Sequence, residues 1–269
     1  MAYLDPNTVT KEKLNELVES WSTTTFGLDF KFRPKQKESI IDIIWNWFHQ
    51  TDNVVLDAPT GSGKSIIAMI VAGVLSSYFG KKGYILISDL SLLQQYANDL
   101  EVYLPDWGII RGQQTYNCAV NGFNFSVGAC KLQGYTSYAE ITAHCPECAP
   151  FCEYMLAREK AINANVTVCT YTHWLLQQNY VRPKMGEIAP FGIRDFVICD
   201  EGHKLLDIVQ NHFSPKFGKE DETKIGTVID HMNIKNKEQL KQNIKLKRQD
   251  PKSCLFLCRF ENNLYLCNR

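Results

Sequence analysis

Long apolar runs are missing from this sequence. No stretch approaches the roughly 18 to 20 consecutive apolar residues that a membrane-spanning helix needs. The opening residues, MAYLDPNTVTKEK, lack the apolar core of a secretory signal peptide. We therefore expect an intracellular protein, in the cytoplasm or the nucleus, that has no membrane partner.

A net charge is also missing, because 29 Lys and Arg residues balance 29 Asp and Glu residues. There is no internal repeat and no low-complexity tract, and 45% of the residues are hydrophobic. This composition excludes the disordered and collagen-like classes. Basic residues do exceed acidic ones in residues 216–269. Such a segment is either solvated surface or a surface that meets phosphate backbones.

Cysteine is too sparse for a small disulfide scaffold, with ten residues in a chain of 269. Half of these cysteines nevertheless crowd into one short stretch, namely Cys118, Cys130, Cys145, Cys148 and Cys152. In a reducing compartment, such crowding favours a metal site over disulfide bridges.

Short apolar runs alternate with helical patterns along most of the chain. The runs at residues 53–57, 84–88, 166–170 and 196–200 are apolar throughout, which is typical of strands buried on both faces. Helical spacing of apolar residues is found at residues 11–21, after Pro34, and at 64–78, 91–103, 153–163 and 173–179. This alternation predicts an α/β fold with a parallel sheet that helices cover on both faces.

Two intervals break the alternation. Residues 111–152 are rich in Gly, Asn, Gln, Thr and Cys, and a loop of that length needs something other than a hydrophobic core to hold it. Residues 214–252 carry the basic excess and a weakly amphipathic helix candidate at 237–246.

The strongest chemical signal is the segment APTGSGKS, Ala58 to Ser65, between a predicted strand and a predicted helix. It matches a phosphate-binding loop whose first glycine is replaced by alanine. Backbone N–H groups and the helix N-terminus would face phosphate, Lys64 would reach the β- and γ-phosphates, and Ser65 would bind Mg²⁺. The expected nucleotide-binding residues are Thr60, Gly61, Ser62, Gly63, Lys64 and Ser65. The alternative is a chance glycine-rich turn.

The second signal is FVICDEGH, an apolar strand that ends in Asp200 and Glu201. Ligands bind at the carboxyl ends of strands in open α/β sheets. Asp200 is expected to hold Mg²⁺, usually through water, and Glu201 to orient and deprotonate the attacking water. The alternative is that the two acids only cap a helix and lie in its first turn.

These two motifs resemble motifs I and II of superfamily 2 helicases, the second of which is commonly D-E-A-H. The resemblance implies that His203 signals ATP hydrolysis to DNA. FRPKQ, residues 32–36, is similar to the element upstream of motif I, which implies that Arg33 and Gln36 meet the adenine end of ATP. ISDLSLLQQ, residues 87–95, resembles motif Ia, which contacts the DNA backbone in such helicases.

The cysteine-rich stretch resembles a narrower group, the xeroderma pigmentosum group D and DinG helicases. RGQQTYNC, ending at Cys118, is similar to the G-R-x-N-Y-x-C that starts their iron-sulfur domain, with Gly and Arg in reversed order. CEY at Cys152, followed by AREKA and VTVCTY, resembles the end of that domain. The resemblance implies a [4Fe-4S] cluster bound by Cys118, Cys152 and two of Cys130, Cys145 and Cys148, in an insertion that acts as a wedge where DNA strands part.

Alternatives remain for the cysteines and for the aromatic residues near them. Four thiolates also bind zinc, and CPEC is a common half of a Cys₄ zinc site; the third alternative is that these thiols are structural and bind no metal. The other five cysteines are expected to be small core residues, namely Cys169, Cys199, Cys254, Cys258 and Cys267. Cys254 and Cys258 also have the spacing of metal ligands, so a second metal site is the alternative for this pair. Aromatic residues of the insertion either stack on bases of single-stranded DNA or cover a small core, namely Tyr116, Phe123, Phe125 and Tyr135.

The whole pattern predicts the N-terminal motor domain of an iron-sulfur DNA helicase, with a role in DNA repair. The expected RecA-like domain comprises residues 1–110 and 160–213 and holds the cluster insertion at 111–159. A short arch-like insertion at 214–252 and a strand within 253–269 that rejoins the sheet are expected to follow.

A second RecA-like domain, in cis or in trans, is an expected partner. Neither S-A-T nor Q-x-x-G-R-x-x-R follows His203, so the arginine finger is expected to come from that domain. We expect the chain alone to hydrolyse ATP weakly, with single-stranded or forked DNA as its other partner. Two rival classes are a phosphate-loop ATPase with a zinc docking module and a fragment that binds ATP and DNA without turnover.

Overall fold

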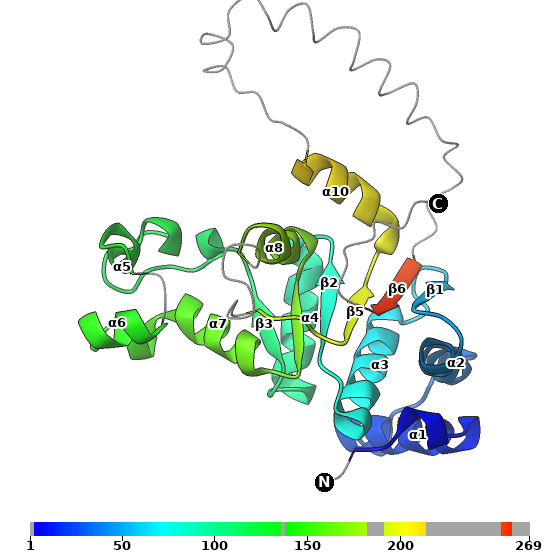
Figure 1. The fold of residues 1–269 in the computed structure, drawn as a ribbon. Coiled ribbons are helices and arrows are strands. Elements are labelled where there is room, and N and C mark those ends of the chain that lie inside the picture. The colour runs from blue at the N-terminus through cyan, green and yellow to red at the C-terminus, as the bar shows by residue number, and fades with distance from the viewer. Residues whose placement is uncertain (1–2, 136–137, 182–190, 214–253, 260–269) are drawn as a thin grey trace, which may run out of the picture.

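The computed structural model describes residues 3–135, 138–181, 191–213 and 254–259 (Figure 1). Within these residues a single six-stranded sheet carries helices on both faces. The predicted α/β class and helix-covered sheet are therefore confirmed.

The sheet has the order β1-β6-β5-β2-β4-β3. Its strands are β1 (Asn53–Asp57), β2 (Gly83–Ile87), β3 (Gly108–Ile110), β4 (Val166–Thr170), β5 (Phe196–Cys199) and β6 (Cys254–Arg259). β2 is parallel to β4 and β5, and β3 is parallel to β4. The prediction of a parallel sheet is confirmed for the five strands β1 to β5, which share one direction, whereas β6 is antiparallel to both β1 and β5 and makes the sheet mixed. β6 overlaps the strand that was expected within residues 253–269.

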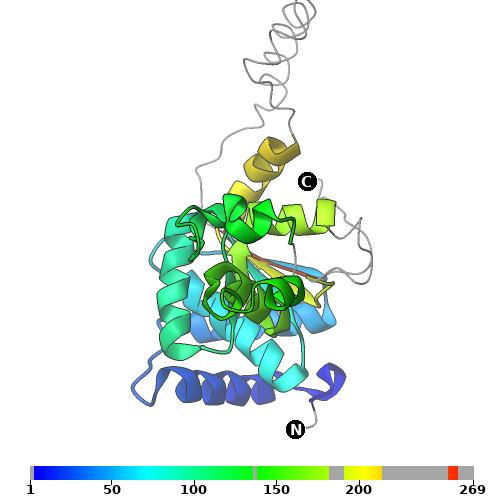
Figure 2. The same ribbon diagram turned by 90° about the vertical axis from the view of Figure 1, so that its left-hand side faces the viewer.

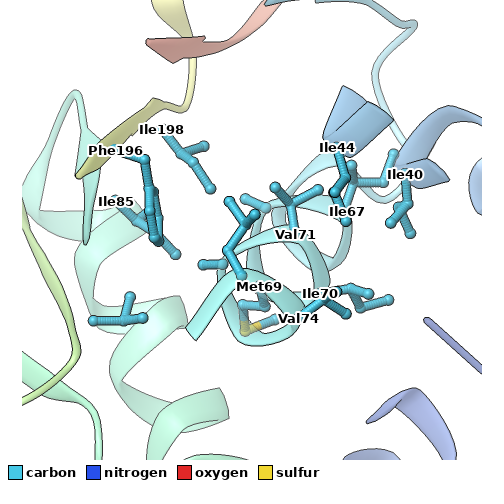
Figure 3. Packing of buried hydrophobic residues seen from close by; sticks show 14 of the residues in the cluster. Ile40, Ile44, Ile67, Met69, Ile70, Val71, Val74, Ile85, Phe196 and Ile198 are labelled. Atoms are coloured by element: carbon cyan, nitrogen blue, oxygen red, sulfur yellow. The ribbon is translucent and has the colours of Figure 1, made fainter. Parts of the chain in front are cut away.

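One face of the sheet is covered by α1 (Lys11–Phe26), α2 (Gln36–His49), α3 (Lys64–Phe79) and α4 (Leu90–Tyr103). α3 is apolar all round, and this explains its position between other helices and the strands. Figure 3 shows side chains of α3 between those of α2 and strand residues such as Ile85 and Phe196. The resulting core fixes the direction in which α3 leaves the phosphate loop.

The other face is covered by α7 (Glu153–Asn163), α8 (Tyr171–Leu176), α10 (Leu205–Phe213) and the cysteine-rich insertion. Successive side chains of a strand point to opposite faces. In β2, Ile85 and Ile87 join the core with α3, whereas Tyr84 and Leu86 join the core with α7 and α8. A π-helical turn, η5 (Gln177–Val181), continues α8. Figures 1 and 2 both place α1 at the opposite end of the molecule from α10.

The insertion between β3 and α7 consists of short elements. These are η2 (Gln113–Thr115), η3 (Phe125–Val127), α5 (Ala129–Leu132), α6 (Tyr138–His144) and η4 (Ala149–Phe151). Phe125 and Ile141 are almost fully buried and belong to the same core as α7 and α8. The insertion is therefore attached to the core under α7 and α8, contrary to the expectation that something other than a hydrophobic core holds it.

Two strands differ from the sequence-based expectation. β1 was expected to be buried on both faces, but its residues alternate in exposure and Val55 is 56% exposed, because β1 is at the edge of the sheet. β3 was not predicted, since three residues carry too little pattern.

The helix candidate at residues 237–246 lies outside the described residues. In the part of the chain that the structure describes, no helix has the length and apolar character needed to cross a membrane.

Candidate functional site

The phosphate loop joins the end of β1 to the start of α3. Gly61 and Gly63 have φ angles of 83° and 82°, which side-chain-bearing residues rarely adopt. A Cβ atom on Gly63 would lie 2.6 Å from Nε2 of Gln36. Both glycines are thus required by the path of the backbone, and the alternative of a chance turn loses support. α3 begins at Lys64, so its N-terminus opens on this loop.

Lys64 is folded over the loop. Its side chain is largely buried, and Nζ donates to the carbonyl oxygens of Ala58 at 3.4 Å and Pro59 at 3.3 Å. Burial raises the pKa of Asp200, and the charge of the Lys64 ammonium group partly opposes that rise. The two motifs therefore form one electrostatic unit.

Asp200 follows β5 and is 2% exposed. Its Oδ2 atom accepts hydrogen bonds from Ser65 Oγ at 3.4 Å and from Tyr96 Oη at 2.9 Å, and Oδ1 accepts from the backbone N–H of Glu201 at 3.0 Å. Burial raises the pKa of Asp200 above its ordinary value, while the bond from Tyr96 opposes that rise. A buried carboxylate beside a serine hydroxyl fits a Mg²⁺ ion, which prefers oxygen ligands and adds positive charge where burial disfavours the anion.

Glu201 has a φ angle of 54°, a strained backbone conformation for a residue with a side chain. Its Oε2 atom lies 3.3 Å from Nδ1 of His203, and the Glu201 side chain is 25% exposed. Glu201 occupies the N-cap position of η7 (Gly202–Lys204), but its side chain makes no cap bond there, and Asp200 Oδ1 is bonded to its neighbour's N–H. The helix-cap alternative therefore loses support, and Glu201 and His203 lie side by side.

Arg33 and Gln36 also contact the phosphate loop. The Arg33 guanidinium donates to the carbonyl of Gly61, and Gln36 Nε2 donates to the carbonyl of Gly63 at 3.3 Å. Gln36 Oε1 in turn accepts from the backbone N–H of Arg33 at 3.0 Å. Both residues expected at the adenine end are thus joined to the loop that would hold the phosphates.

The segment that resembles motif Ia forms the turn from β2 into α4. Asp89 caps α4 by accepting from the N–H of Leu92 at 3.0 Å, and its bonds to Ser91, Leu92 and Ser88 hold its pKa well below the ordinary value. Lys204, at the end of η7, donates to Ser88 Oγ at 3.2 Å and lies 3.6 Å from Asp89. The turn is therefore tied directly to the segment that follows Glu201.

Two tyrosines near Asp200 were missed by the sequence analysis. Tyr96 donates to its carboxylate, and Tyr171 donates to its backbone carbonyl at 2.8 Å. Burial raises the pKa of Tyr96 well above its ordinary value, so its hydroxyl stays a donor. The available signal was a polar hydroxyl on the apolar stripe of a helix, between Leu93 and Leu100, which indicates a buried hydrogen bond.

The structure brings all five cysteines of the insertion together, and none forms a disulfide. Their thiols influence one another: burial, and then Cys148 and Cys145, raises the pKa of Cys130 to about 12. Burial also raises the pKa of Cys148 and Cys152, and Cys118 acts on both. Cys148 is the thiol that influences, or is influenced by, the pKa of the most others in this stretch.

These thiols suit a metal group that removes their protons on binding. Among the described residues, no three His, Cys, Asp or Glu side chains surround one position for a single metal ion. A Cys₄ zinc site needs all its sulfur atoms at about 2.3 Å from one ion, whereas the thiolates of a four-iron cluster bind different irons and lie farther apart. Neither group is established by this geometry, and both remain predictions.

The four aromatic residues of the insertion that were expected either to stack on bases or to cover a small core differ in their surroundings. Tyr116 and Phe125 are buried against Tyr154, with Phe125 and Tyr154 ring centres 4.3 Å apart. Tyr135 stacks on His144 at 4.7 Å. Phe123 is 64% exposed, so it alone of these four aromatic residues presents most of its surface to solvent.

The remaining cysteines lie away from the insertion. Cys169 and Cys199 are buried strand residues, as expected, and Cys267 lies outside the described residues. Cys254 and Cys258 both belong to β6, where a separation of four residues spans about 13 Å. A second metal site that uses both of them for one ion is therefore wrong.

Comparison with known proteins covers most of the chain. No curated protein matches it. Residues 29–246 match the model of the family described as "Type III restriction enzyme, res subunit", a helicase-like family of superfamily 2. This range includes the phosphate loop, Asp200 and Glu201. Because the match spans well over half of the sequence, the chain belongs to the type III restriction enzyme res subunit family, within the ATP-hydrolysing helicase-like superfamily.

Proposed function

We propose that the chain is the ATP-binding motor domain of an ATP-dependent DNA helicase that carries a [4Fe-4S] cluster and uses ATP hydrolysis to move along or unwind DNA. The observation that carries this proposal is the contact between Ser65 and Asp200, which joins the phosphate loop to the motif II carboxylates.

The residues of the ATP site divide the work. Thr60 to Ser65 surround the phosphates with backbone N–H groups, and Lys64 neutralises their charge. Ser65 and Asp200 would hold Mg²⁺, which would offset the charge that develops on the phosphate oxygens. Arg33 and Gln36 fix the adenine end.

Glu201 is the general base in this proposal. It orients the attacking water and takes its proton. His203 Nδ1 lies 3.3 Å from the Glu201 carboxylate. In this proposal, His203 changes position when ATP is hydrolysed and thereby signals hydrolysis to the bound nucleic acid. A second RecA-like domain, in cis or in trans, supplies the arginine that stabilises the transition state.

DNA is the proposed track, single-stranded or forked. The family description supports DNA over RNA, since restriction enzymes cut DNA. The proposed units are the motor at residues 1–110 and 160–213, the cluster insertion at 111–159, the arch-like segment at 214–252 and the rejoining strand within 253–269.

The cluster would be bound by Cys118, Cys152 and two of Cys130, Cys145 and Cys148. What supports a shared metal group is that the five thiols are free and lie in one short insertion, where several of them influence one another's pKa. Its role is structural, because it cross-links a segment whose helices are too short to be stable alone. Zinc is the competing assignment for the same thiols.

The ATP site is tested by Lys64→Ala, with the exposed Lys31→Ala as the matched control. Binding of a fluorescent ATP analogue and phosphate release should both be lost in Lys64→Ala and be retained in the control. Unchanged affinity and rate in Lys64→Ala would contradict the phosphate-loop assignment.

The metal group is tested by purification without oxygen, followed by quantification of iron, acid-labile sulfide and zinc. The expected result is a brown protein with iron and sulfide in equal amounts. Cys152→Ser should bleach it and expose residues 111–152 to protease, whereas Cys169→Ser, in β4, should not. Stoichiometric zinc without sulfide would show that the cysteines bind zinc and not a cluster. That result would not contradict the proposed ATP site.

A further inference from the structure

A buried tyrosine connects the turn that resembles motif Ia to the magnesium site. Tyr96 lies in α4, is 1% exposed, and donates its hydroxyl hydrogen to Oδ2 of Asp200 at 2.9 Å. The two residues are 104 positions apart in the sequence. The contact therefore exists only because α4 packs against the sheet at β4, where Tyr96 comes within reach of the residue that follows β5.

Three donors fix the orientation of the Asp200 carboxylate. Ser65 and Tyr96 share Oδ2, and the backbone N–H of Glu201 bonds Oδ1. Ser65 belongs to the phosphate loop and Glu201 is the next residue in the chain, so both lie inside the ATP site. Tyr96 is the donor among these three that reaches the carboxylate from an element outside that site.

The same helix is held at its beginning by the segment that follows Glu201. Lys204 contacts Ser88 and Asp89, and Asp89 caps α4. α4 and the motif II segment thus meet at two places, at the helix start and at Tyr96. Leu93 and Leu100 pack on the same stripe as Tyr96. Because α4 is held at both places, it moves as a rigid unit. A displacement of its first residues therefore also displaces the Tyr96 hydroxyl.

We propose that Tyr96 is a positioning residue that couples nucleic acid bound at residues 87–95 to Mg²⁺ binding at Asp200. The inference rests on the proposed function, since it needs ATP at the phosphate loop and nucleic acid at this turn. Nucleic acid that fixes the start of α4 fixes the Tyr96 hydroxyl and keeps Oδ2 directed at Ser65. By linkage, Mg²⁺ bound with ATP strengthens nucleic-acid binding by the same factor.

Two tyrosine-to-phenylalanine variants separate this role from packing. Tyr96→Phe removes the bond to the carboxylate, whereas Tyr171→Phe removes a bond of similar length to the backbone carbonyl of the same residue. Both tyrosines are almost fully buried, and phenylalanine fills nearly the same space. Tyr171→Phe is therefore the matched control for loss of a buried hydroxyl next to Asp200.

The assay measures binding of a fluorescent non-hydrolysable ATP analogue by the full chain as Mg²⁺ is varied, with and without a single-stranded oligonucleotide. In Tyr96→Phe, the Mg²⁺ concentration for half-maximal binding should rise about ten-fold, the size expected for one hydrogen bond to a charged group. Affinity for the analogue in EDTA should stay within about two-fold of the wild type, because the phosphate loop is intact. The oligonucleotide should lower the Mg²⁺ requirement of the wild type and of Tyr171→Phe, but not that of Tyr96→Phe.

An unchanged Mg²⁺ requirement in Tyr96→Phe, or an equal rise in Tyr171→Phe, would overturn the inference. A loss of affinity in EDTA that matches the loss in Mg²⁺ would also overturn it, since that pattern indicates general damage. A wild type that binds no analogue refutes the proposed function itself, whereas a wild type that binds normally beside an unaffected Tyr96→Phe refutes the coupling alone.

Hydrogen exchange on the wild-type chain tests the coupling without any variant. Amides of α4 (Leu90–Tyr103) should exchange more slowly when Mg²⁺ is added to the chain saturated with the analogue. Amide exchange in α1, which packs against α2 and α3, should not change. No slowing in α4 would overturn the inference.

Discussion

The two positive-φ glycines of the phosphate loop allow a quantitative test of how that loop binds nucleotide. Gly61 and Gly63 have nearly the same φ, but their surroundings differ. A Cβ atom on Gly61 meets nothing within 4 Å, whereas one on Gly63 lies 2.6 Å from Gln36 Nε2. Gly61→Ala therefore adds backbone strain alone, and Gly63→Ala adds the same strain together with displacement of Gln36.

The magnitudes follow from these two contributions. An L-residue in the left-handed region costs about 1 to 2 kcal/mol. The empty loop of Gly61→Ala relaxes to avoid this cost and only a minor fraction keeps the binding-competent conformation, so ATP affinity should fall about ten-fold. Displacing Gln36 also breaks its bonds to the Gly63 carbonyl and the Arg33 N–H, each contributing about 0.5 to 1.5 kcal/mol. Gly63→Ala should thus cost about 3 kcal/mol, or about one hundred-fold in affinity.

The assay is a titration of each variant with a fluorescent ATP analogue in Mg²⁺, and then with the matching GTP analogue. Because Gln36 is assigned to the adenine end, Gly63→Ala should also reduce the ratio of ATP affinity to GTP affinity. Gly61→Ala should lower both affinities by the same factor and leave this ratio unchanged. Equal losses in the two variants, or a preference for ATP that survives intact in Gly63→Ala, would refute the reasoning that links Gln36 to the loop.

Three further predictions concern catalysis, the attachment of α7 and acid stability. Glu201→Gln should keep ATP affinity and slow phosphate release by about 10² to 10⁴-fold, as expected for loss of a general base; single-turnover release at the wild-type rate would remove Glu201 from that role. Arg194→Leu should destabilise the fold by about 2 to 4 kcal/mol in urea unfolding, because the buried guanidinium donates to carbonyls at the end of α7 and to Gly83 at 3.0 Å; a loss below about 0.5 kcal/mol would contradict this. Burial, with a smaller effect of the Arg158 charge, lowers the pKa of His173 to about 4. A depressed pKa means that the folded chain resists protonation while the unfolded chain accepts it near pH 6.5, so stability present above pH 6.5 should be lost as the pH falls towards 4. His173→Phe should flatten this part of the curve of unfolding free energy against pH, and an identical curve in the variant would be the contrary result.

Much of the ATP site could be predicted because its residues are contiguous in the sequence. Wrapping a backbone around phosphate requires glycine at fixed positions and a helix directly afterwards, so residues 58–65 carry the whole requirement. The helix at residues 64–78 was predicted for a similar local reason, since it is almost continuously apolar, and the helix predicted at 153–163 was found with its predicted ends. The strand 166–170 was found with its predicted ends.

Other features could not be predicted, because they depend on which segments become neighbours. β1 is as apolar as the central strands, but its edge position exposes Val55. The antiparallel β6 also depends on strand order, since no residue pattern distinguishes the two directions. Arg194 reads as an ordinary charged residue until α7 and β2 bring their carbonyl oxygens to it.

The sequence by itself determined the chemistry of the two motifs, the α/β class and the gathering of cysteines in one insertion. The tertiary structure decided the relation between these parts: the contact of Ser65 with Asp200, the bond of Tyr96 to the same carboxylate, and the core that the insertion shares with α7 and α8. The physical reason is the range of the interactions involved. Phosphate loops and helix patterns are written in neighbouring residues, whereas a hydrogen bond across more than one hundred positions forms only after strands and helices have packed.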